Sequence, residues 1–316
     1  MESFKKIELE DIKIIKPFFV NQETRICDYS VATRFMWRDF FNQEYIIIDE
    51  TIIFKIRLNG DTWFEYPLGK NVELALEYIE NYCQQTNQKL VFGTIPYEYM
   101  LKLLNRYPDY QLMFDRNWCD YLYEYESFRL HQGKKYNKRR NQIKNFEKNY
   151  PNHRFELITA ENIGKVNKFY NEFMEEFSET SPIAIEEAKQ VNCSLNHLSE
   201  FNLIGGALFV DDNVVGFSLG EIVNDTLIHH IEKANTNYSG VYQKLVYDYL
   251  QLFVDKGVVY VNREEDDGDV GLRRSKFSYR PTKLLNKYTI FTKKQEMNIN
   301  LVSLKKLSSI NQSIGI

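Results

Sequence analysis

The residues 258–281, VVYVNREEDDGDVGLRRSKFSYRP, join an apolar run to a dense block of both charge signs. The opening VVYV is β-branched and short, which is typical of a buried strand. Acidic residues then surround Gly268, and basic residues follow on a helical stretch that Pro281 ends. The charged side chains are Glu264, Glu265, Asp266, Asp267, Asp269, Arg273, Arg274, Lys276 and Arg280. Loops at strand ends are where α/β folds place binding groups, so we expect these charges to meet a ligand or each other. A solvated surface loop is the alternative.

The composition indicates a densely packed protein with one large or two medium domains, since 316 residues include 43% hydrophobic and 15% aromatic side chains. A net charge of −4 excludes a global attraction to nucleic acid or membrane, so any such contact needs a local patch. The four cysteines show no metal-ligand spacing, and no metal site is predicted. The polar N-terminus and the absence of a transmembrane-length apolar run predict a soluble, cytoplasmic protein.

The first part of the chain, residues 1–128, predicts an N-terminal domain with alternating strands and helices. Two apolar runs within 44–58 indicate a hairpin. A helix is expected over 71–86, a strand over 89–95, and a helix from Pro96 to about residue 106. A long strand over 111–125 closes this part. The order of these elements predicts a mixed α/β layer structure.

The segment 129–151 predicts a basic bridging helix, with eight basic residues and one acid between positions 129 and 148. One face is apolar, formed by Tyr136, Ile143, Phe146 and Tyr150. The basic side chains could grip the phosphates of RNA or an anionic lipid head group. The candidates for this contact are Lys138, Arg139, Arg140 and Lys144. One of the two arginines is expected to point partly inward and to need an anionic partner. A solvated linker helix is the alternative.

The sequence predicts a second domain over residues 152–294, followed by a tail over 295–316. Two helices come first, and three strands over 203–210, 214–223 and 227–234 form a meander. A polar loop leads into a helix over 240–256 with Gly257 as its cap, and a strand over 258–262 follows. Ser239 and Gly240 could cradle phosphates at that helix N-terminus, with Ser239 as the cap. The alternative role for Ser239 is capping alone.

Two segments carry a family resemblance: KKYNKRRNQIKNFEKNYP at 134–151 and NREEDDGDVGLRRSKFSYRPTKLLNKY at 262–288. They resemble domain-of-unknown-function family 2156, which is similar to the C-terminal catalytic domain of lysylphosphatidylglycerol synthases. The resemblance covers residues 25–293 and implies an α/β (α+β) fold of two tandem Gcn5-related N-acetyltransferase-like (GNAT) domains. Each would have a mixed, mostly antiparallel sheet flanked by helices, as in Fem-type transferases. The synthases carry an N-terminal membrane domain that this sequence does not show, which leaves the acceptor open.

The resemblance implies transfer of an aminoacyl or acyl group from aminoacyl-tRNA or acyl-CoA to an amine or hydroxyl acceptor. The acceptor would be a small molecule or a lipid head group, and no tightly bound cofactor is expected. Such chemistry needs a base and positive charge for an oxyanion. The candidates for the base, or for holding an α-ammonium, are Glu232, Glu264, Glu265 and Asp266. Arg273 and Lys276 could stabilise the oxyanion or a phosphate. An ion-pair network is the alternative role for all six.

Two further expectations concern the strand at 227–234 and the function class. Neighbouring residues of a strand face opposite ways, so of Glu232 and Lys233 only one can face the core. For the same reason we expect one of His229 and His230 to be packed and the other exposed. The alternative to an enzyme is a non-catalytic binding or scaffold protein that has kept the GNAT-like fold.

Overall fold

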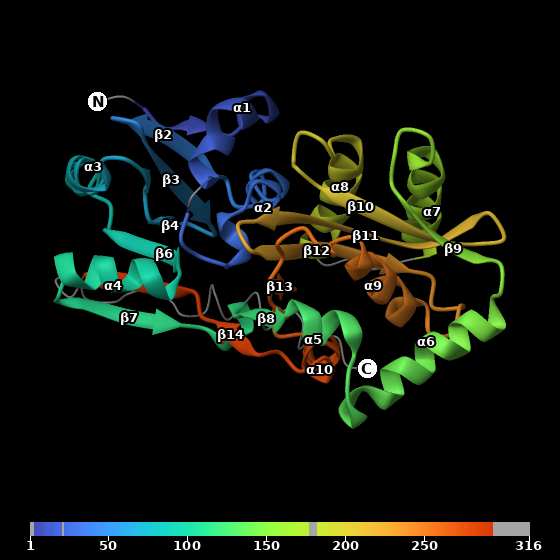
Figure 1. Cartoon of the computed structure of the whole chain (residues 1–316). Helices are drawn as coiled ribbons and strands as arrows, with labels where there is room; N and C mark the ends of the chain where they lie inside the picture. The colour runs from blue at the N-terminus through green and yellow to red at the C-terminus, as the bar shows by residue number, and fades with distance from the viewer. Residues whose placement is uncertain (1–2, 21, 177–181, 293–316) are drawn as a thin grey trace. The chain divides into compact units, whose positions relative to one another are not determined.

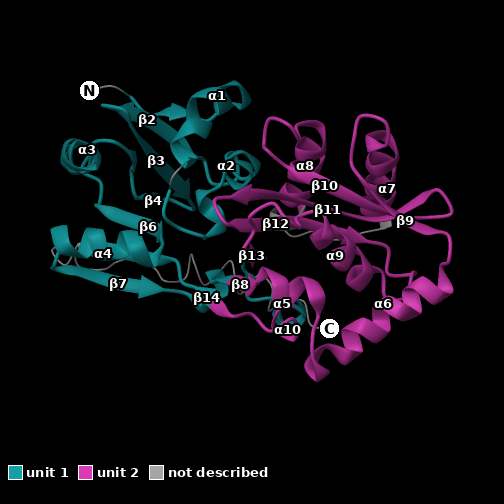
Figure 2. Ribbon diagram, in the orientation of Figure 1, with its two compact units in different colours: residues 1–120, 265–275, 284–316 teal, residues 121–264, 276–283 magenta. Residues whose placement is uncertain are grey.

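The computed structural model describes residues 3–20, 22–176 and 182–292 (Figure 1). Two compact units are present (Figure 2), and neither is continuous in sequence. The first comprises 1–120, 265–275 and 284–316, and the second comprises 121–264 and 276–283. The domain limits that the sequence suggests, at residues 128 and 151, remain predictions. The expected tail, 295–316, lies outside the described residues.

The first unit is built on an eight-stranded sheet in the order β1-β2-β3-β4-β6-β15-β7, with β5 paired to β3. Its strands are β1 (Lys5–Lys6), β2 (Glu44–Ile48), β3 (Thr51–Leu58), β4 (Asp61–Phe64), β5 (Leu68–Gly69), β6 (Val91–Ile95), β7 (Tyr110–Phe114) and β15 (Tyr288–Thr292). The pairs are antiparallel except for β4 and β6. The hairpin and the strand–helix alternation expected from the sequence are confirmed.

Short helices connect these strands, and polar caps fix where two of them begin. They are α1 (Ile12–Ile15), α2 (Val31–Met36), α3 (Val72–Gln85) and α4 (Tyr97–Arg106), with short 3-10 turns between them. The Ser30 side chain accepts a hydrogen bond from the Thr33 N–H at the start of α2, and Asn71 does the same for Leu74 at the start of α3. Phe54, Phe64 and Phe92 are fully buried in the core beneath them.

The second unit is built on a seven-stranded sheet in the order β14-β8-β13-β12-β11-β10-β9. Its strands are β8 (Asp120–Glu124), β9 (His153–Leu157), β10 (Ile204–Val210), β11 (Asn213–Val223), β12 (Thr226–Ala234), β13 (Tyr260–Asn262) and β14 (Lys283–Leu285). The predicted meander β10-β11-β12 is antiparallel. β12 pairs in parallel with β13 only over 226–228, although β12 continues to Ala234. The pairing stops at Ile228 because β13 ends at its partner, Asn262.

Helices cover both faces of this sheet, α7 and α8 on one face and α9 on the other (Figure 1). The helices are α5 (Tyr125–Leu130), α6 (Asn137–Asn149), α7 (Ile163–Glu176), α8 (Pro182–Asn196), α9 (Val241–Gln251) and α10 (Val270–Ser278). Phe217 packs on Tyr170 of α7, whereas Val215 packs with Leu245 of α9. Two mixed, mostly antiparallel sheets flanked by helices confirm the predicted fold class.

Two predicted element bounds are wrong. The long strand expected over 111–125 is two strands, because the Asp115 side chain accepts a hydrogen bond from the Asn117 N–H and sets a 3-10 turn between them. β7 and β8 consequently belong to different sheets. The helix expected to run to Gly257 ends at Gln251, and turns occupy the residues up to Gly257.

Of the segment 129–151 predicted as a basic bridging helix, residues 137–149 form the helix α6, which lies within the second unit and packs against α9. Tyr136, Ile143 and Phe146 are buried as the apolar stripe predicts. Gly240 approaches α6 so closely that an added Cβ would lie 2.6 Å from the Gln142 carbonyl oxygen. Gly240 is itself the N-cap of α9, in a left-handed conformation with φ +85° and without a side-chain cap bond. The prediction that Ser239 caps this helix is therefore wrong.

We expect Gly240→Ala to destabilise the protein by about 2–4 kcal/mol, because it adds a left-handed alanine and a steric clash with Gln142. Gly257→Ala is the matched control, since φ there is +74° and nothing lies within 4 Å of the added Cβ. It should cost only about 1 kcal/mol. Urea unfolding measures both, and equal losses would contradict the close packing of α6 on α9.

Candidate active site

The acidic residues that leave β13 are held by different cationic groups. Glu265 contacts Lys287 and Asp266 contacts Arg273, all within the first unit. Glu264 contacts His230 within the second unit. Of these three pairs, only Asp266 with Arg273 joins two members of the charged block that the sequence singles out, because His230 and Lys287 lie outside it.

The Lys287 cluster consists of Cys27, Asp28, Asp120, Glu265 and Lys287 of the first unit. The Lys287 Nζ atom lies 2.6 Å from Asp28 Oδ2, 2.8 Å from Asp120 Oδ1 and 3.0 Å from Glu265 Oε2. It also lies 3.3 Å from Cys27 Sγ. The Lys287 and Asp120 side chains are 5% and 0% exposed, whereas those of Asp28 and Glu265 are 26% and 25% exposed. The cluster therefore has a buried centre and two carboxylates that solvent reaches.

The electrostatics of the Lys287 cluster follow from one ammonium among several acids. Burial alone would lower the pKa of Lys287, but Asp120 and Asp28 outweigh it and raise that pKa well above its ordinary value. Burial, with repulsion from Glu265 and Asp28, raises the pKa of Asp120 to about 7 in spite of Lys287. Burial and the charge of Asp120 likewise raise the pKa of the Cys27 thiol. Cys27 is thus a packed thiol rather than a nucleophile.

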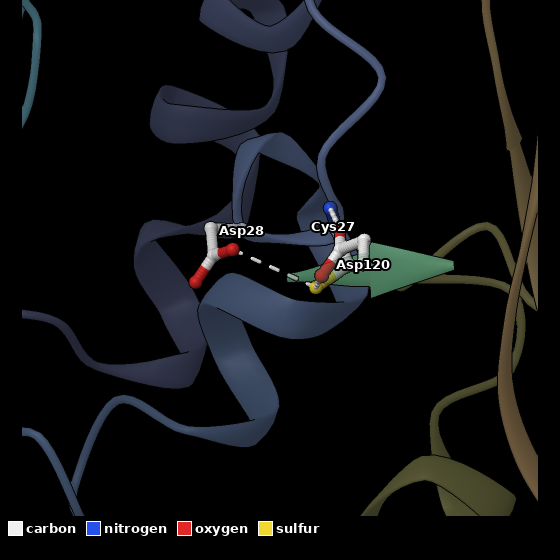
Figure 3. Close-up of side chains that lie close together, drawn as sticks. All are labelled: Cys27, Asp28 and Asp120. Carbon is white, nitrogen blue, oxygen red and sulfur yellow. Dashed lines mark hydrogen bonds between the residues drawn. The ribbon is translucent and has the colours of Figure 1, made fainter. Parts of the chain in front are cut away.

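Three members of the cluster could also act as metal ligands. One ligand atom each from Cys27, Asp28 and Asp120 lies within 4.8 Å of the others (Figure 3). A thiol and two carboxylates are a reasonable donor set for a divalent ion. The Lys287 ammonium, however, lies within hydrogen-bonding distance of the same three groups and already supplies the positive charge. The prediction of no metal site stays a prediction.

Asp266 belongs to a second ion-pair group of the first unit. Its carboxylate is 0% exposed and accepts hydrogen bonds from Arg273 at 2.6 and 2.9 Å. Arg116 contributes a third contact at 3.3 Å, and Arg273 also donates to the Asn117 side chain at 2.7 Å. A fully buried carboxylate with bidentate arginine pairing is suited to holding the 265–275 segment in place. The catalytic roles expected for Asp266 and Arg273 remain predictions.

The His230 cluster consists of Glu221, His230 and Glu264 of the second unit. The His230 ring places Nδ1 2.7 Å from Glu264 Oε1 and Nε2 3.1 Å from Glu221 Oε1. The His230 and Glu221 side chains are 1% and 2% exposed. Burial alone would lower the pKa of His230, but the bonds to Glu221 and Glu264 raise it to about 9. The ring is therefore an imidazolium at neutral pH, with both N–H groups donated to carboxylates.

The other candidates on β12 and α10 form separate contacts in the second unit. Glu232 pairs with Arg263, and Lys276 donates to the Arg263 carbonyl oxygen at 2.6 Å. Lys233 pairs with Glu187 of α8 at 2.7 Å, so Glu232 and Lys233 have different partners, as opposite faces of a strand require. The roles expected for Glu232 and Lys276 remain predictions.

The expectation for the paired histidines is half wrong, since both side chains are buried. His229 stacks on Tyr249 of α9 with ring centroids 4.8 Å apart. Burial, with the charge of Arg263, lowers its pKa well below the ordinary value. Strand alternation correctly predicts that His229 and His230 have different partners. It does not predict that Glu221 and Glu264 cover the His230 ring.

The basic residues of α6 divide into an exposed set and a partnered set. Lys138 and Lys144 are exposed, together with Lys134, Lys135 and Lys148. Arg139 donates to Ser278 and lies over the Tyr279 ring at 4.1 Å, while Arg140 donates to the carbonyl oxygens of residues 131 and 133. Among the described residues, both arginines therefore have neutral hydrogen-bond partners, and the expected anionic partner is not found.

Several members of these clusters were not singled out from the sequence. Lys287 lies in the segment 262–288 that carries the family resemblance, at the end of LLNK. A single lysine at that place gives no local indication of a role. Glu221 is the one acid of β11, and Asp120 begins β8, whose other acid, Glu124, is exposed. An acid beside buried neighbours is the available signal at both positions. Cys27 shows no spacing pattern at all. Their roles depend on contacts between distant parts of the chain.

Fold and site together define a two-sheet α/β protein with buried acids and bases at the ends of its strands. The chain belongs to the family described as phosphatidylglycerol lysyltransferase, C-terminal, whose model matches residues 20–291. The resemblance found in the sequence is thereby confirmed. Membership supports an acyltransferase-like function. Among the described residues, no helix combines the length and the apolar character that a membrane crossing requires.

Two solved structures share this fold, and a further relative matches in sequence. A conserved protein of unknown function from Bacteroides thetaiotaomicron is 26% identical with a TM-score of 0.83, covering 93% of this chain and 100% of that chain. L-PGS from Bacillus licheniformis is 14% identical with a TM-score of 0.68, covering 97% and 99%, which shows the fold alone. An uncharacterized protein of Mycoplasmoides gallisepticum is 25% identical over 172 residues. That match spans 54% of this chain and 55% of the relative, about half of each.

We expect Lys287→Ala to destabilise the protein by about 3–5 kcal/mol, because it leaves Asp120 buried beside two other carboxylates. Adding Asp120→Asn to that variant should recover part of the loss, since one of the uncompensated charges disappears. Lys70→Ala removes the exposed partner of Glu50 and should leave stability unchanged. Urea unfolding tests all three, and a Lys287→Ala protein as stable as wild type would show that the cluster carries little energy.

We expect the stability difference between wild type and His230→Gln to shrink as the pH rises. The pKa of His230 is about 9 in the folded state, above its ordinary 6.5, so the stabilisation is fully present below pH 6.5 and is lost as the pH passes about 9. The change amounts to about 3 kcal/mol between pH 6 and pH 10. Urea unfolding at several pH values measures it. The free energy of unfolding of His229→Phe should fall with rising pH as it does in the wild type. If this free energy varied with pH in the same way for wild type and His230→Gln, the raised pKa assigned to His230 would be contradicted.

Proposed function

We propose that this protein is a cytoplasmic acyltransferase that moves an aminoacyl group from aminoacyl-tRNA to an amine or hydroxyl acceptor. Membership of the family described as phosphatidylglycerol lysyltransferase, C-terminal, supports the class of reaction. The acceptor is either a lipid head group or a small molecule that bears such a nucleophile.

The observation that carries the choice of donor is the exposed basic face of α6. Its lysines point to solvent while the opposite, apolar face packs into the second unit. Lysines without buried partners can exchange counterions for phosphates, which is how proteins gain affinity for nucleic acid. On a chain with a net charge of −4, a local patch of this kind is needed for any contact with tRNA.

The packing of α9 speaks against acyl-CoA as the main donor. A helix N-terminus binds phosphate through open backbone N–H groups. Here the first residue of that terminus, Gly240, lies against the Gln142 carbonyl oxygen of α6, and the Val241 N–H is bonded to Tyr238. At the predicted cradle of Ser239 and Gly240, the N-cap residue is thus packed against α6 and the next N–H group is already bonded, so acyl-CoA ranks second to aminoacyl-tRNA.

The proposed chemistry needs an acid–base group and positive charge where the oxyanion develops. The acceptor attacks the aminoacyl ester carbonyl, its proton passes to a carboxylate, and the tRNA hydroxyl leaves with a proton. Within the second unit, Glu264 is a part-exposed carboxylate that is suited to take the proton. Lys276 of the same unit remains a candidate for oxyanion stabilisation.

We expect binding of aminoacyl-tRNA to weaken steeply with salt and to depend on α6. A Lys138→Glu/Lys144→Glu variant should bind at least about tenfold more weakly, with the slope of log affinity against log salt reduced by about 1.5. Fluorescence titration at several salt concentrations measures this. Lys168→Glu/Lys189→Glu is the matched control, with two exposed lysines on α7 and α8.

Transfer of a labelled aminoacyl group to added amines, hydroxyl compounds or phosphatidylglycerol vesicles tests the reaction itself. Wild-type protein that binds aminoacyl-tRNA without salt dependence, or not at all, would remove tRNA as the donor. Salt-dependent binding with no transfer to any acceptor would instead favour the non-catalytic binding protein.

A further inference from the structure

The His230 cluster is a line of three ionisable groups that leads from the core to the surface. Glu221 lies on β11, His230 on β12, and Glu264 two residues beyond the end of β13. The inner two side chains are almost fully buried, whereas the Glu264 side chain is 25% exposed. The adjacent charged or titratable side chain on the same strand is His229, which is directed toward Tyr249 instead.

The backbone fixes Glu264 at this place. β12 and β13 stop pairing at Ile228 and Asn262, and Glu264 follows with φ +54°, a left-handed conformation that a residue with a Cβ rarely adopts. The Asn262 side chain accepts a hydrogen bond from the Glu264 N–H at 2.7 Å, and the Glu264 carbonyl accepts one from Tyr121 at 3.1 Å. Backbone strain that is held by several contacts is characteristic of functional positions.

His230 gives the two carboxylates a common cation. Glu221 and Glu264 bind the two nitrogens of one ring, so without it two carboxylates would face each other with no positive charge between them. Such carboxylate pairs share a proton, and the outer one then stops working as a base. With the imidazolium in place, the cluster carries one net negative charge, and its outer end is the Glu264 carboxylate.

We propose that His230 is a positioning residue that, backed by Glu221, holds Glu264 as the ionised carboxylate that receives the acceptor's proton during acyl transfer. This rests on the proposed function. The acceptor N–H or O–H bond breaks as its heteroatom bonds to the ester carbonyl, and the proton goes to Glu264. The acyl–oxygen bond to the tRNA then breaks, and the leaving oxygen takes the proton from Glu264, so the cluster returns to its starting state.

A double-mutant cycle on turnover tests this role, with wild type, His230→Gln, Glu264→Gln and the double variant. Glutamine keeps one hydrogen-bond donor in place of His230 but carries no charge. Each single variant should lose about 10²–10³-fold in the single-turnover transfer rate at saturating aminoacyl-tRNA. Binding of aminoacyl-tRNA should stay unchanged. The double variant should lose no more than either single one, because His230 acts through Glu264.

His229→Phe is the matched control, because it alters the neighbouring buried ring and keeps the stacking on Tyr249. It should transfer at the wild-type rate. Nitrogen-15 NMR of the His230 ring gives a readout apart from activity. The ring should be doubly protonated at pH 7.5 in wild type and should lose this state in a Glu221→Gln/Glu264→Gln variant.

The outcomes separate this role from the proposed function. Two results would overturn the positioning role even if the wild type transfers aminoacyl groups. One is a double variant whose loss in transfer rate equals the product of the two single losses. The other is a neutral His230 ring in the wild type. A His230→Gln protein that transfers at the wild-type rate would do the same. A correctly folded wild type that transfers no aminoacyl group to any acceptor overturns the proposed function, and this role with it.

Discussion

The burial of the Lys287 ammonium among three carboxylates is the constraint on which the first unit depends. A buried ammonium is tolerated only when opposite charges and hydrogen bonds surround it, and a buried Asp120 carboxylate needs the same ammonium. The members of this cluster come from residues 27 and 28, from the start of β8, from the 264–269 loop and from the residue before β15. Chain segments far apart in sequence must therefore be in place before any one of these charges can leave water.

The acidic run after β13 is one loop that contributes residues to several clusters. Glu264, Glu265 and Asp266 are consecutive, yet their partners are an imidazolium, an ammonium and a guanidinium. Successive side chains point in different directions, so a run of like charges is tolerated when each member is neutralised separately. Asp266 is fully buried in this way, whereas Glu264 and Glu265 each remain a quarter exposed. Of the three, Glu264 and Glu265 therefore combine a paired carboxylate with access to solvent.

Local features of the fold could be predicted from the sequence, and long-range partners could not. Periodicity located the meander, the basic helix and its buried stripe at 136, 143 and 146, because each depends on neighbours along the chain. The break at Asp115 was missed, since one side-chain bond to the backbone outweighed a β-rich composition. The candidate acids of the 264–266 run were identified, but Asp120, Glu221 and Lys287 were not. Each is a single residue whose role follows from its contacts with groups a hundred or more positions away, or across a sheet.

The helix α6 links the packing of the second unit to the donor that we propose. Its apolar face packs on α9, where Gln142 meets Gly240, and this occupies the surface that a helix N-terminus would otherwise offer to a phosphate. The other face of α6 carries lysines that are exposed and are not part of the core. A helix that only covered α9 would need no cluster of repelling charges on its outer side, because like charges at i, i+4 and nearby spacings weaken a helix. That cost is offset if a polyanion neutralises the lysines, and a nucleic acid donor does so over a longer surface than the diphosphate of a coenzyme can reach.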